Sequence, residues 1–133
     1  MEELKQLGKP TVYPDHPDSA PLDTFENKCQ HRKYTIVCNC PEFTHICPIT
    51  GQPDFAKITI TYVPDKRCIE SKSLKIYLAS YRNQGVFHEA VTNKILDDII
   101  AVADPYYVKV DGDFNTRGGI SIVVTAEHNK ETN

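Results

Sequence analysis

The chain has 133 residues, with 15 Lys and Arg against 18 Asp and Glu and a formal net charge of −3. This length forms one domain with a core of ordinary size, and the net negative charge argues against a general nucleic-acid or membrane surface. The apolar runs are only a few residues long, too short to span a bilayer. The polar start MEELKQLGKP is unlike a secretory signal. We therefore expect a cytoplasmic protein that binds neither nucleic acid nor a membrane directly, and whose five cysteines are reduced thiols.

Residues 1–30 are predicted to be an extended, proline-rich arm. Prolines at positions 10, 14, 17 and 21 interrupt any helix or central strand, and acidic residues are scattered between them. The sequence leaves open whether this arm is disordered or lies across a neighbouring subunit. A single domain is expected over residues 31–128, followed by a short polar tail, residues 129–133.

Two strands are expected after the arm, separated by a long loop. Residues 34–40 and residues 55–63 both alternate apolar and polar side chains, the pattern of a strand with one buried face. The predicted buried faces are Tyr34, Ile36, Cys38 and Cys40 on the first strand and Ala56, Ile58, Ile60 and Tyr62 on the second. The loop between the strands has about a dozen residues, which is long for a compact domain and marks a candidate functional segment.

Two helices are expected in the middle of the chain. Ser71 or Ser73 is predicted to cap the first, because a hydroxyl at a helix start accepts from free backbone N–H groups. Asn83-Gln84-Gly85 separates the helices, and Pro105 ends the second. The apolar stripes that predict these helices are Leu74, Tyr77, Leu78 and Tyr81, then Phe87, Val91, Ile95 and Ile99.

Two further strands, residues 106–110 and 120–124, are expected to close the chain. The resulting order, ββααββ, predicts an α+β fold in which both hairpins join one antiparallel sheet and the helices cover one face. Such a sheet has two exposed edges, and edge-to-edge pairing of identical sheets in a ring would remove them. We therefore expect a homo-oligomer.

Cys47 is the strongest candidate nucleophile among the five cysteines. It lies in the long loop, in a stretch rich in Pro and Gly, where exposure and a lowered pKa would activate a thiol. Cys38 and Cys40 share the apolar face of a strand and are expected in the core. Cys29 and Cys68 have no distinctive context. The sequence does not decide whether any of these four forms a disulfide with Cys47.

A zinc site is disfavoured. Cys38, Cys40, His45 and Cys47 lie close in sequence, but structural zinc sites use paired ligands on tight turns. Here the first two cysteines are on a strand and no second pair follows downstream. We expect no metal.

Two acidic residues have both an ordinary and a functional interpretation. Asp54 is either a solvated carboxylate at a strand start or, in a pocket that the substrate closes, a proton donor beside the thiol. Glu89 opens the second helix, where an acid commonly stabilises the helix dipole. The alternative role for Glu89 is an ionised carboxylate that accepts two parallel N–H bonds from a guanine-type edge. Without further information the residue pattern favours the dipole role.

Three basic residues form a candidate phosphate site. Lys72 and Lys75 lie at the start of the first helix, and a helix N-terminus itself attracts anions. Arg117 precedes two glycines that permit close approach of the backbone to a ligand. The chain has no G-x-G-x-x-G after a strand, so a dinucleotide would not be held in a Rossmann unit.

Four motifs carry a resemblance to a known family. CPITGQPDFA, ESKSLKIY, FHE and RGGISI occur in this order within residues 33–125, and together they resemble the short, single-domain NADPH-dependent 7-cyano-7-deazaguanine reductases of queuosine biosynthesis, a tRNA-modification pathway. The octapeptide fits that family's pattern E-S-K-S-x-K-x-Y at every fixed position. The resemblance implies the tunnelling fold, in which protomers close into a ring-shaped β-barrel and two rings stack, here as a decamer of two pentamers with active sites at subunit boundaries.

The resemblance also implies a mechanism and a set of site residues. Cys47 would add to the nitrile carbon to form a covalent thioimidate, Asp54 would protonate nitrogen, and His88 would assist the second proton transfer. Two NADPH would each supply a hydride, giving 7-aminomethyl-7-deazaguanine. The implied substrate-binding residues are Ile69, Glu70, Ser71, His88 and Glu89, and the implied NADPH-binding residues are Ser71, Lys72, Lys75, Arg117 and Gly118.

Two rival functions remain at this point. A zinc-dependent pterin enzyme of the GTP cyclohydrolase type resembles this family in architecture, but it would need a Cys/His metal set and would not need ESKSLKIY. A non-catalytic oligomeric module that binds a purine-like ligand is the second alternative. The sequence gives neither the exact ring size nor the order of the hydride and proton steps.

Overall fold

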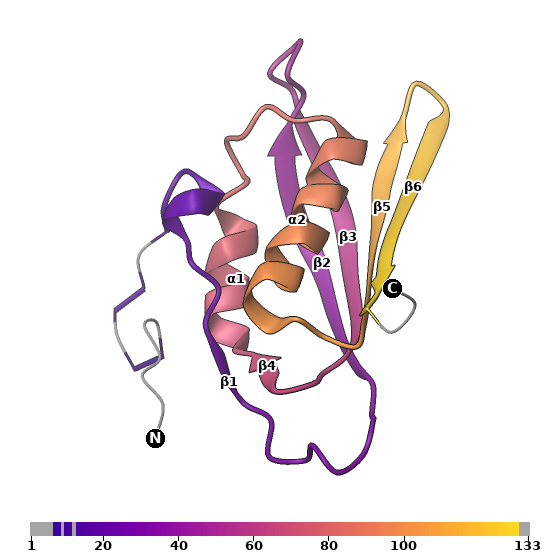
Figure 1. Cartoon of the computed structure of the whole chain (residues 1–133). Coiled ribbons are helices and arrows are strands. Elements are labelled where there is room, and N and C mark those ends of the chain that lie inside the picture. The colour runs from indigo at the N-terminus through magenta and orange to yellow at the C-terminus, as the bar shows by residue number, and fades with distance from the viewer. Residues whose placement is uncertain (1–6, 9, 12, 131–133) are drawn as a thin grey trace.

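The computed structural model describes residues 7–8, 10–11 and 13–130. Within these residues, helices cover one face of an antiparallel sheet (Figure 1). The elements are the 3-10 helix η1 Pro17–Ser19, β1 Thr24–Glu26, β2 Ile36–Ile46, β3 Pro53–Val63, β4 Arg67–Ile69, α1 Ser71–Ala79, α2 His88–Ala103, β5 Tyr107–Arg117 and β6 Ile120–Asn129. The large sheet has the order β2-β3-β5-β6, and β1 pairs with β4 in a small second sheet. This confirms the predicted α+β plan.

The core lies between the sheet and the helices. The predicted face of β3 is buried throughout, because alternate side chains of a strand point to the same side. On α2 the predicted ridge is buried at Val91, Ile95 and Ile99, but Phe87 is 57% exposed. Phe87 precedes the first turn of α2 and caps it without a side-chain hydrogen bond, so it does not share the helical face. The inclusion of Phe87 in the core ridge is therefore wrong.

β2 is longer than predicted, and the loop after it is correspondingly shorter. The strand continues past Cys40 to Ile46 through a register shift between Cys40 and Phe43. Pro41 falls within that shift, on an edge strand, where a missing N–H breaks no ladder bond. The predicted loop of about a dozen residues is thus reduced to residues 47–52. Asp54 lies in β3 and not in a loop.

The second half of the predicted N-terminal arm packs against its own domain. The Arg82 guanidinium donates to the carbonyl of Pro14 at 2.9 Å and pairs with Asp15 at 2.8 Å. Ala20 is 1% exposed, and β1 adds to β4. Regular structure therefore begins before the first predicted strand at residues 34–40, because prolines at these positions are compatible with the 3-10 helix η1 and the two-stranded sheet of β1 and β4. The parts of the arm at residues 1–6, 9 and 12, and residues 131–133 of the tail, lie outside the described residues.

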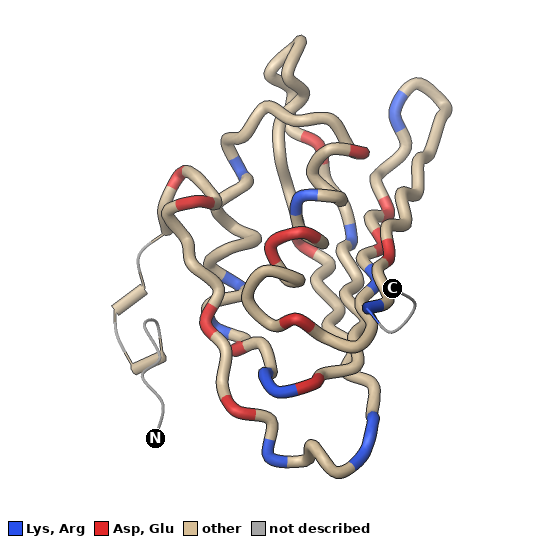
Figure 2. The backbone as a smooth tube through the Cα atoms, in the orientation of Figure 1, with Lys and Arg blue, Asp and Glu red and all other residues tan. Residues whose placement is uncertain are grey.

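The open edges and surface of the sheet remain accessible in the single chain. β2 and β6 are its edge strands, and Val37, Ile120 and Val123 expose 51%, 65% and 62% of their surface. Positions of Lys and Arg are interspersed with positions of Asp and Glu along the backbone (Figure 2). No helix among the described residues has the length and apolar character needed to cross a membrane.

The direction of each helix decides where the candidate residues lie. α1 starts beside β4 at the lower end of the molecule, and α2 starts at the upper end, above the sheet (Figure 1). The β2–β3 turn and the β5–β6 turn also lie at the upper end. Residues at the start of α2 and in these turns are therefore neighbours, whereas residues at the start of α1 are far from them.

Candidate active site

The upper end of the sheet is held together by backbone hydrogen bonds. The amide of Ile46 donates to the carbonyl of Gln84 at 3.0 Å, and the amide of Val86 donates to the carbonyl of Ile46 at 3.2 Å. His45 pairs with Asp54 across the β2–β3 ladder. The segment that leads into α2 is thereby fixed to the end of β2, which brings the first turn of α2 to the turn that follows this strand.

Cys47 begins a tight turn that presents its thiol. The amide of Gly51 donates to the carbonyl of Cys47 at 2.9 Å, and the amide of Cys47 donates to the carbonyl of Gln52 at the same distance. Gly51 has a φ of 71°, a left-handed conformation that favours glycine. The Thr50 hydroxyl and the backbone N–H groups of Thr50 and Ile49 donate to the sulfur and lower the pKa of the Cys47 thiol. The predicted activation of this cysteine therefore has a structural cause.

Thr50 is a site residue that the sequence did not single out. We expect Thr50→Val to raise the pKa of Cys47, because the change removes the largest of the interactions that favour the thiolate. The rate of iodoacetamide alkylation of Cys47, followed against pH by mass spectrometry, would shift to higher pH in the variant. Thr50→Ser keeps the hydroxyl and should retain the wild-type profile. Identical profiles for the valine variant and wild type would contradict this assignment.

Asp54 forms an ion pair with Arg117. The guanidinium Nε lies 3.0 Å from Oδ1 of Asp54, whose side chain is 13% exposed, and a second guanidinium nitrogen donates to the carbonyl of Pro53. Arg117, predicted to bind NADPH, is thus engaged within its own chain.

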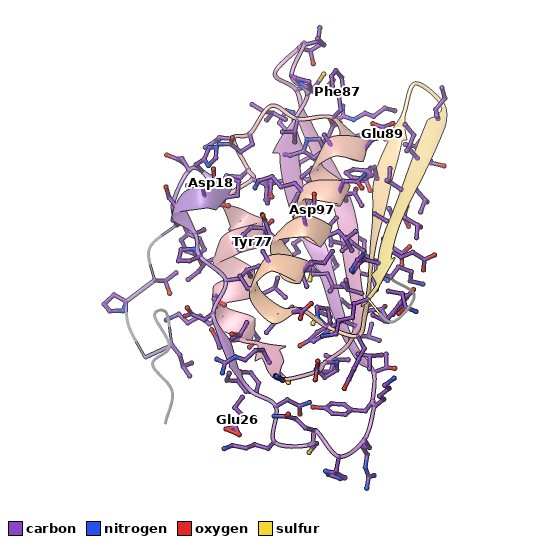
Figure 3. The ribbon with its side chains drawn as sticks, in the orientation of Figure 1. Asp18, Glu26, Tyr77, Phe87, Glu89 and Asp97 are labelled. Carbon is purple, nitrogen blue, oxygen red and sulfur yellow. The ribbon has the colours of Figure 1, made fainter. Side chains whose placement is uncertain are left out.

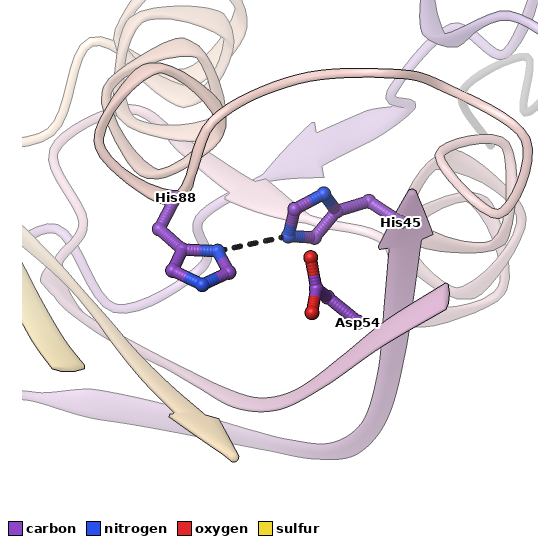
Figure 4. Close-up of side chains that lie close together, drawn as sticks. All are labelled: His45, Asp54 and His88. Carbon is purple, nitrogen blue, oxygen red and sulfur yellow. Dashed lines mark hydrogen bonds between the residues drawn. The ribbon is translucent and has the colours of Figure 1, made fainter. Parts of the chain in front are cut away.

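Two imidazole rings lie beside Asp54 in the close-up (Figure 4). Nε2 of His45 is 3.1 Å from Nδ1 of His88, and one ligand atom from each of these residues and from Asp54 lies within 4.8 Å of the others. His88 stacks on Phe114 at a centroid distance of 3.9 Å and an interplanar angle of 18°. His45 is completely buried, and burial lowers its pKa. The His88 ring is therefore fixed on two sides.

Among the described side chains, those of His45, Asp54 and His88 lie close enough together to hold a metal ion. Two imidazoles and a carboxylate are ligands that Zn²⁺ accepts. This set differs from the cysteine-rich set considered from the sequence, because His45 and Asp54 meet across the strand ladder. In this arrangement the two rings hydrogen-bond to each other and Asp54 pairs with Arg117.

Gly112 makes room for the ring that supports His88. A Cβ at this position would lie 2.6 Å from Cε2 of Phe114 and 2.9 Å from Oγ1 of Thr92, and both side chains are buried. We expect Gly112→Ala to reduce the free energy of unfolding by about 1–3 kcal/mol, because the Phe114 ring must move in a packed core. Urea denaturation would measure the loss. Thr116→Ala, at an exposed position of the same strand, should leave stability nearly unchanged, and equal stabilities of the two variants would contradict the close approach.

Glu89 occupies the first turn of α2 with an exposed side chain, near exposed Phe87 at the upper end of the molecule (Figure 3). The Asn93 side-chain amide donates a hydrogen bond to the backbone carbonyl of Glu89 at 2.9 Å, and not to its carboxylate. Within the described part of the chain no ion pair involves its carboxylate. Glu89 is therefore accessible to a ligand from outside the chain, and its position also suits the helix-dipole role.

The residues predicted around the start of α1 lie at the opposite end of the helix layer (Figure 1). Glu70 caps α1, because its carboxylate accepts from the amides of Lys72 at 2.6 Å and Ser73 at 2.8 Å. The prediction of a serine cap is wrong: Ser71 is the first helical residue, and the Ser73 hydroxyl donates to the carbonyl of Glu70. Ile69 is buried, whereas Ser71 and Lys75 are exposed.

A cavity of about 660 Å³ lies between β2 and α1. Ser71 and Lys75 line it together with mainly apolar side chains that include Leu74 and Leu78. Cys47, Asp54 and His88 do not contribute to it. We place the chemistry at the upper end because the activated thiol is there. Of the predicted site residues, the cavity adjoins only some of those at the start of α1.

The candidate residues therefore form two groups on one chain. The upper group contains Cys47, Asp54, His88, Glu89, Arg117 and Gly118, and the lower group contains Ile69, Glu70, Ser71, Lys72 and Lys75. The sequence did not single out Phe114 or Thr50, and it considered His45 only as a zinc ligand. The alternation of β2 past Pro41 is the one signal that would have placed His45 next to Asp54.

Comparison with known proteins identifies relatives along most of the chain. The profile of a family described as QueF-like protein matches residues 53–133, more than half of the chain. A protein of Magnetococcus marinus named NADPH-dependent 7-cyano-7-deazaguanine reductase is 58% identical over 115 residues, covering 86% of this chain and 90% of the relative. A protein of the same name from Porphyromonas gingivalis is 53% identical over 131 residues, covering 97% and 84%.

A solved structure supports the fold. The archaeosine synthase QueF-Like in its apo form matches with a TM-score of 0.63 at 24% identity, covering 71% of this chain and 91% of that chain. At this identity the similarity concerns the fold alone. The identity to the two bacterial relatives is far higher and extends over most of their length. The chain therefore belongs to the QueF-like family, together with the NADPH-dependent 7-cyano-7-deazaguanine reductases.

Proposed function

We propose that this chain reduces the nitrile of 7-cyano-7-deazaguanine to the primary amine 7-aminomethyl-7-deazaguanine with NADPH, in queuosine biosynthesis. The observation that carries the proposal is the position of Cys47, an accessible thiol with a lowered pKa in a turn beside Asp54. A nitrile accepts hydride poorly, and addition of a thiolate converts it into a C=N group that can be protonated and reduced. The names of relatives at 53–58% identity support the same reaction.

Cys47 is the nucleophile in this mechanism. Its sulfur forms a bond to the nitrile carbon while nitrogen takes up a proton from Asp54, which gives the thioimidate. Reduction of this C=N, and departure of the thiolate from the reduced carbon, leaves an imine. Reduction of the imine and a second proton, for which His88 is the assigned donor, give the amine and free Cys47.

NADPH supplies the hydride for each of the two reductions. The residues proposed to bind it are Ser71, Lys72, Lys75, Arg117 and Gly118. A helix N-terminus with two ammonium groups suits a dinucleotide phosphate. Arg117 would then exchange the Asp54 carboxylate for a phosphate, so cofactor binding would release Asp54 from this ion pair.

Substrate recognition is assigned to both groups of residues. Glu89 would accept two parallel N–H bonds from the guanine-type edge, and His88 would contact the ring. Ile69, Glu70 and Ser71 would contact it from the start of α1, Glu70 through its backbone, since its carboxylate already caps the helix. Because the upper and lower groups lie at opposite ends of the folded molecule (Figure 1), one complete site needs a second copy of the chain.

The oligomer proposed is a decamer of two stacked pentamers with the tunnelling fold. The support is physical: β2 and β6 are open edges with exposed apolar side chains, and pairing β2 of one copy with β6 of the next would remove both edges. Light scattering coupled to size exclusion would give a mass near ten chains. A monomer that turns over at the full rate would overturn a shared site.

The decisive experiment follows NADPH oxidation with and without the nitrile. The proposed reaction consumes two NADPH for each amine formed, and the amine is identified by mass spectrometry. A binding module would bind the purine-like ligand without oxidising NADPH. A zinc enzyme of the GTP cyclohydrolase type would lose activity with a chelator, and metal analysis of the purified protein tests this alternative directly.

A further inference from the structure

His45 is a buried titratable side chain to which the proposed mechanism gives no role. It lies at the end of β2, is 0% exposed, and has aromatic rings around it. Its edge faces Phe114 at a centroid distance of 5.7 Å and an interplanar angle of 87°. A buried imidazole needs partners for both nitrogens, and the partners it has determine which nitrogen carries the proton.

The protonation pattern of His45 follows from its neighbours. Nδ1 lies 3.3 Å from the carbonyl oxygen of Ile46, and the carbonyl of Val86 also acts on this ring. A carbonyl oxygen can only accept, so Nδ1 of His45 carries the hydrogen. Burial lowers the pKa of His45 and keeps the ring neutral, although the two carbonyls and Asp54 oppose this effect. Nε2 of His45 is therefore an acceptor.

This acceptor in turn fixes the proton of His88. Nε2 of His45 lies 3.1 Å from Nδ1 of His88, so Nδ1 of His88 must be the donor of this bond (Figure 4). The stacked Phe114 ring holds the plane of the imidazole. Nε2 of neutral His88 then bears a lone pair, and no hydrogen bond from the described residues is recorded at this atom.

We propose that His45 is a positioning residue that holds His88 as the tautomer protonated on Nδ1, leaving Nε2 of His88 as the atom that takes up a proton and then donates it to the substrate. The proposal rests on the proposed function for its chemical consequence, but the tautomer itself does not depend on it. Two hydrogen bonds in series join His88 to His45 and His45 to the carbonyl of Ile46. The donor of each bond follows from the fact that this carbonyl can only accept. Asp54 does not take this orienting role, because the hydrogen bonds of the two imidazoles among the described residues run to each other and to Ile46 and not to Asp54.

The tautomer can be read directly in the intact protein. Solid-state NMR on protein labelled with ¹⁵N-histidine, at neutral pH with EDTA present, distinguishes a protonated from an unprotonated ring nitrogen. The wild-type spectrum should show His88 with hydrogen on Nδ1, its signals being assigned by their loss in His88→Gln. Exposed His31 gives the reference for an unrestrained ring. A wild-type His88 that carries its hydrogen on Nε2 overturns the proposal without any variant.

Two variants of His45 test the consequence. His45→Leu removes the acceptor, and His45→Gln places an amide oxygen near the position of Nε2. We expect the leucine variant to release His88 to the other tautomer and to lower kcat roughly tenfold with little change in KM, the effect of one lost hydrogen bond on the active population. The glutamine variant should restore most of both the NMR pattern and kcat.

The outcomes separate this proposal from the proposed function. Loss of kcat in the leucine variant with an unchanged His88 tautomer overturns it, as does a changed tautomer with unchanged kcat. Wild-type protein that does not oxidise NADPH but shows hydrogen on Nδ1 of His88 would refute the proposed function and leave the tautomer assignment standing. Thermal unfolding of both variants identifies any loss of activity that follows from unfolding.

Discussion

Replacement of Cys47 with alanine is expected to abolish both turnover and the near-ultraviolet absorbance band that accompanies the thioimidate. Burial raises the pKa of Cys38 and raises that of Cys40 to about 11, and Cys68 is buried, so these three thiols do not share the surroundings of Cys47. Loss of a catalytic nucleophile costs on the order of 10⁶ in kcat in a well-studied protease, so the remaining rate should be undetectable. The measurement is a spectrum of enzyme mixed with the nitrile, followed by NADPH oxidation.

Cys29→Ala is the matched control. Cys29 is an exposed, free thiol in the segment between β1 and β2, which lies at the lower end of the molecule (Figure 1), so its removal should change neither the band nor the rate. Mass spectrometry of the denatured wild-type complex should find the added mass on the peptide that contains Cys47. An alanine variant that still builds the band would exclude Cys47 as the nucleophile and, with it, the mechanism above.

Replacement of Glu89 with leucine is expected to weaken substrate binding roughly 100-fold, or by about 3 kcal/mol. In a site closed by a second copy, the two N–H groups of the guanine-type edge would lose their acceptor and remain unpaired. Calorimetry with the nitrile and Cys47→Ala as the common background measures affinity without turnover. The effect should fall on the dissociation constant for substrate, with NADPH affinity unchanged.

Asp97→Leu provides the control for Glu89. Asp97 is an exposed acid further along α2, away from its N-terminus (Figure 3). The substitution therefore removes a negative charge from the same helix without changing the proposed site. If Glu89→Leu lowers stability but leaves affinity at the wild-type value, the side chain has only the helix-dipole role that the sequence pattern favoured.

The Asp54–Arg117 pair changes how the implied roles of the two residues relate. Family resemblance assigned Arg117 to the cofactor and Asp54 to proton transfer, as separate functions. In the single chain they bind each other at 3.0 Å. Because one arginine cannot satisfy the carboxylate and a phosphate in the same geometry, binding of the cofactor and pairing with Asp54 would compete for the same guanidinium.

Local sequence determined the order of the elements and the chemistry of the motifs. Alternation on β3 and the helical spacing on α2 depend on neighbours a few positions away, and burial at Ile58, Ile60, Ile95 and Ile99 agrees with both. Four short motifs in order identified the family, because the spacing and types of their residues are visible within each short stretch. The ββααββ order and the α+β class followed from the same local patterns.

Only the tertiary structure decided which distant residues meet. The bulge that carries β2 past Pro41 brings His45 opposite Asp54, and Pro14 and Asp15 of the arm dock on the domain through Arg82. Glu70 caps α1 because its backbone is held by Asp23 of the arm, whose carbonyl accepts from the Glu70 amide at 2.9 Å. These contacts join residues far apart in the chain. Their free energy depends on packing that the local periodicity of apolar residues does not reveal.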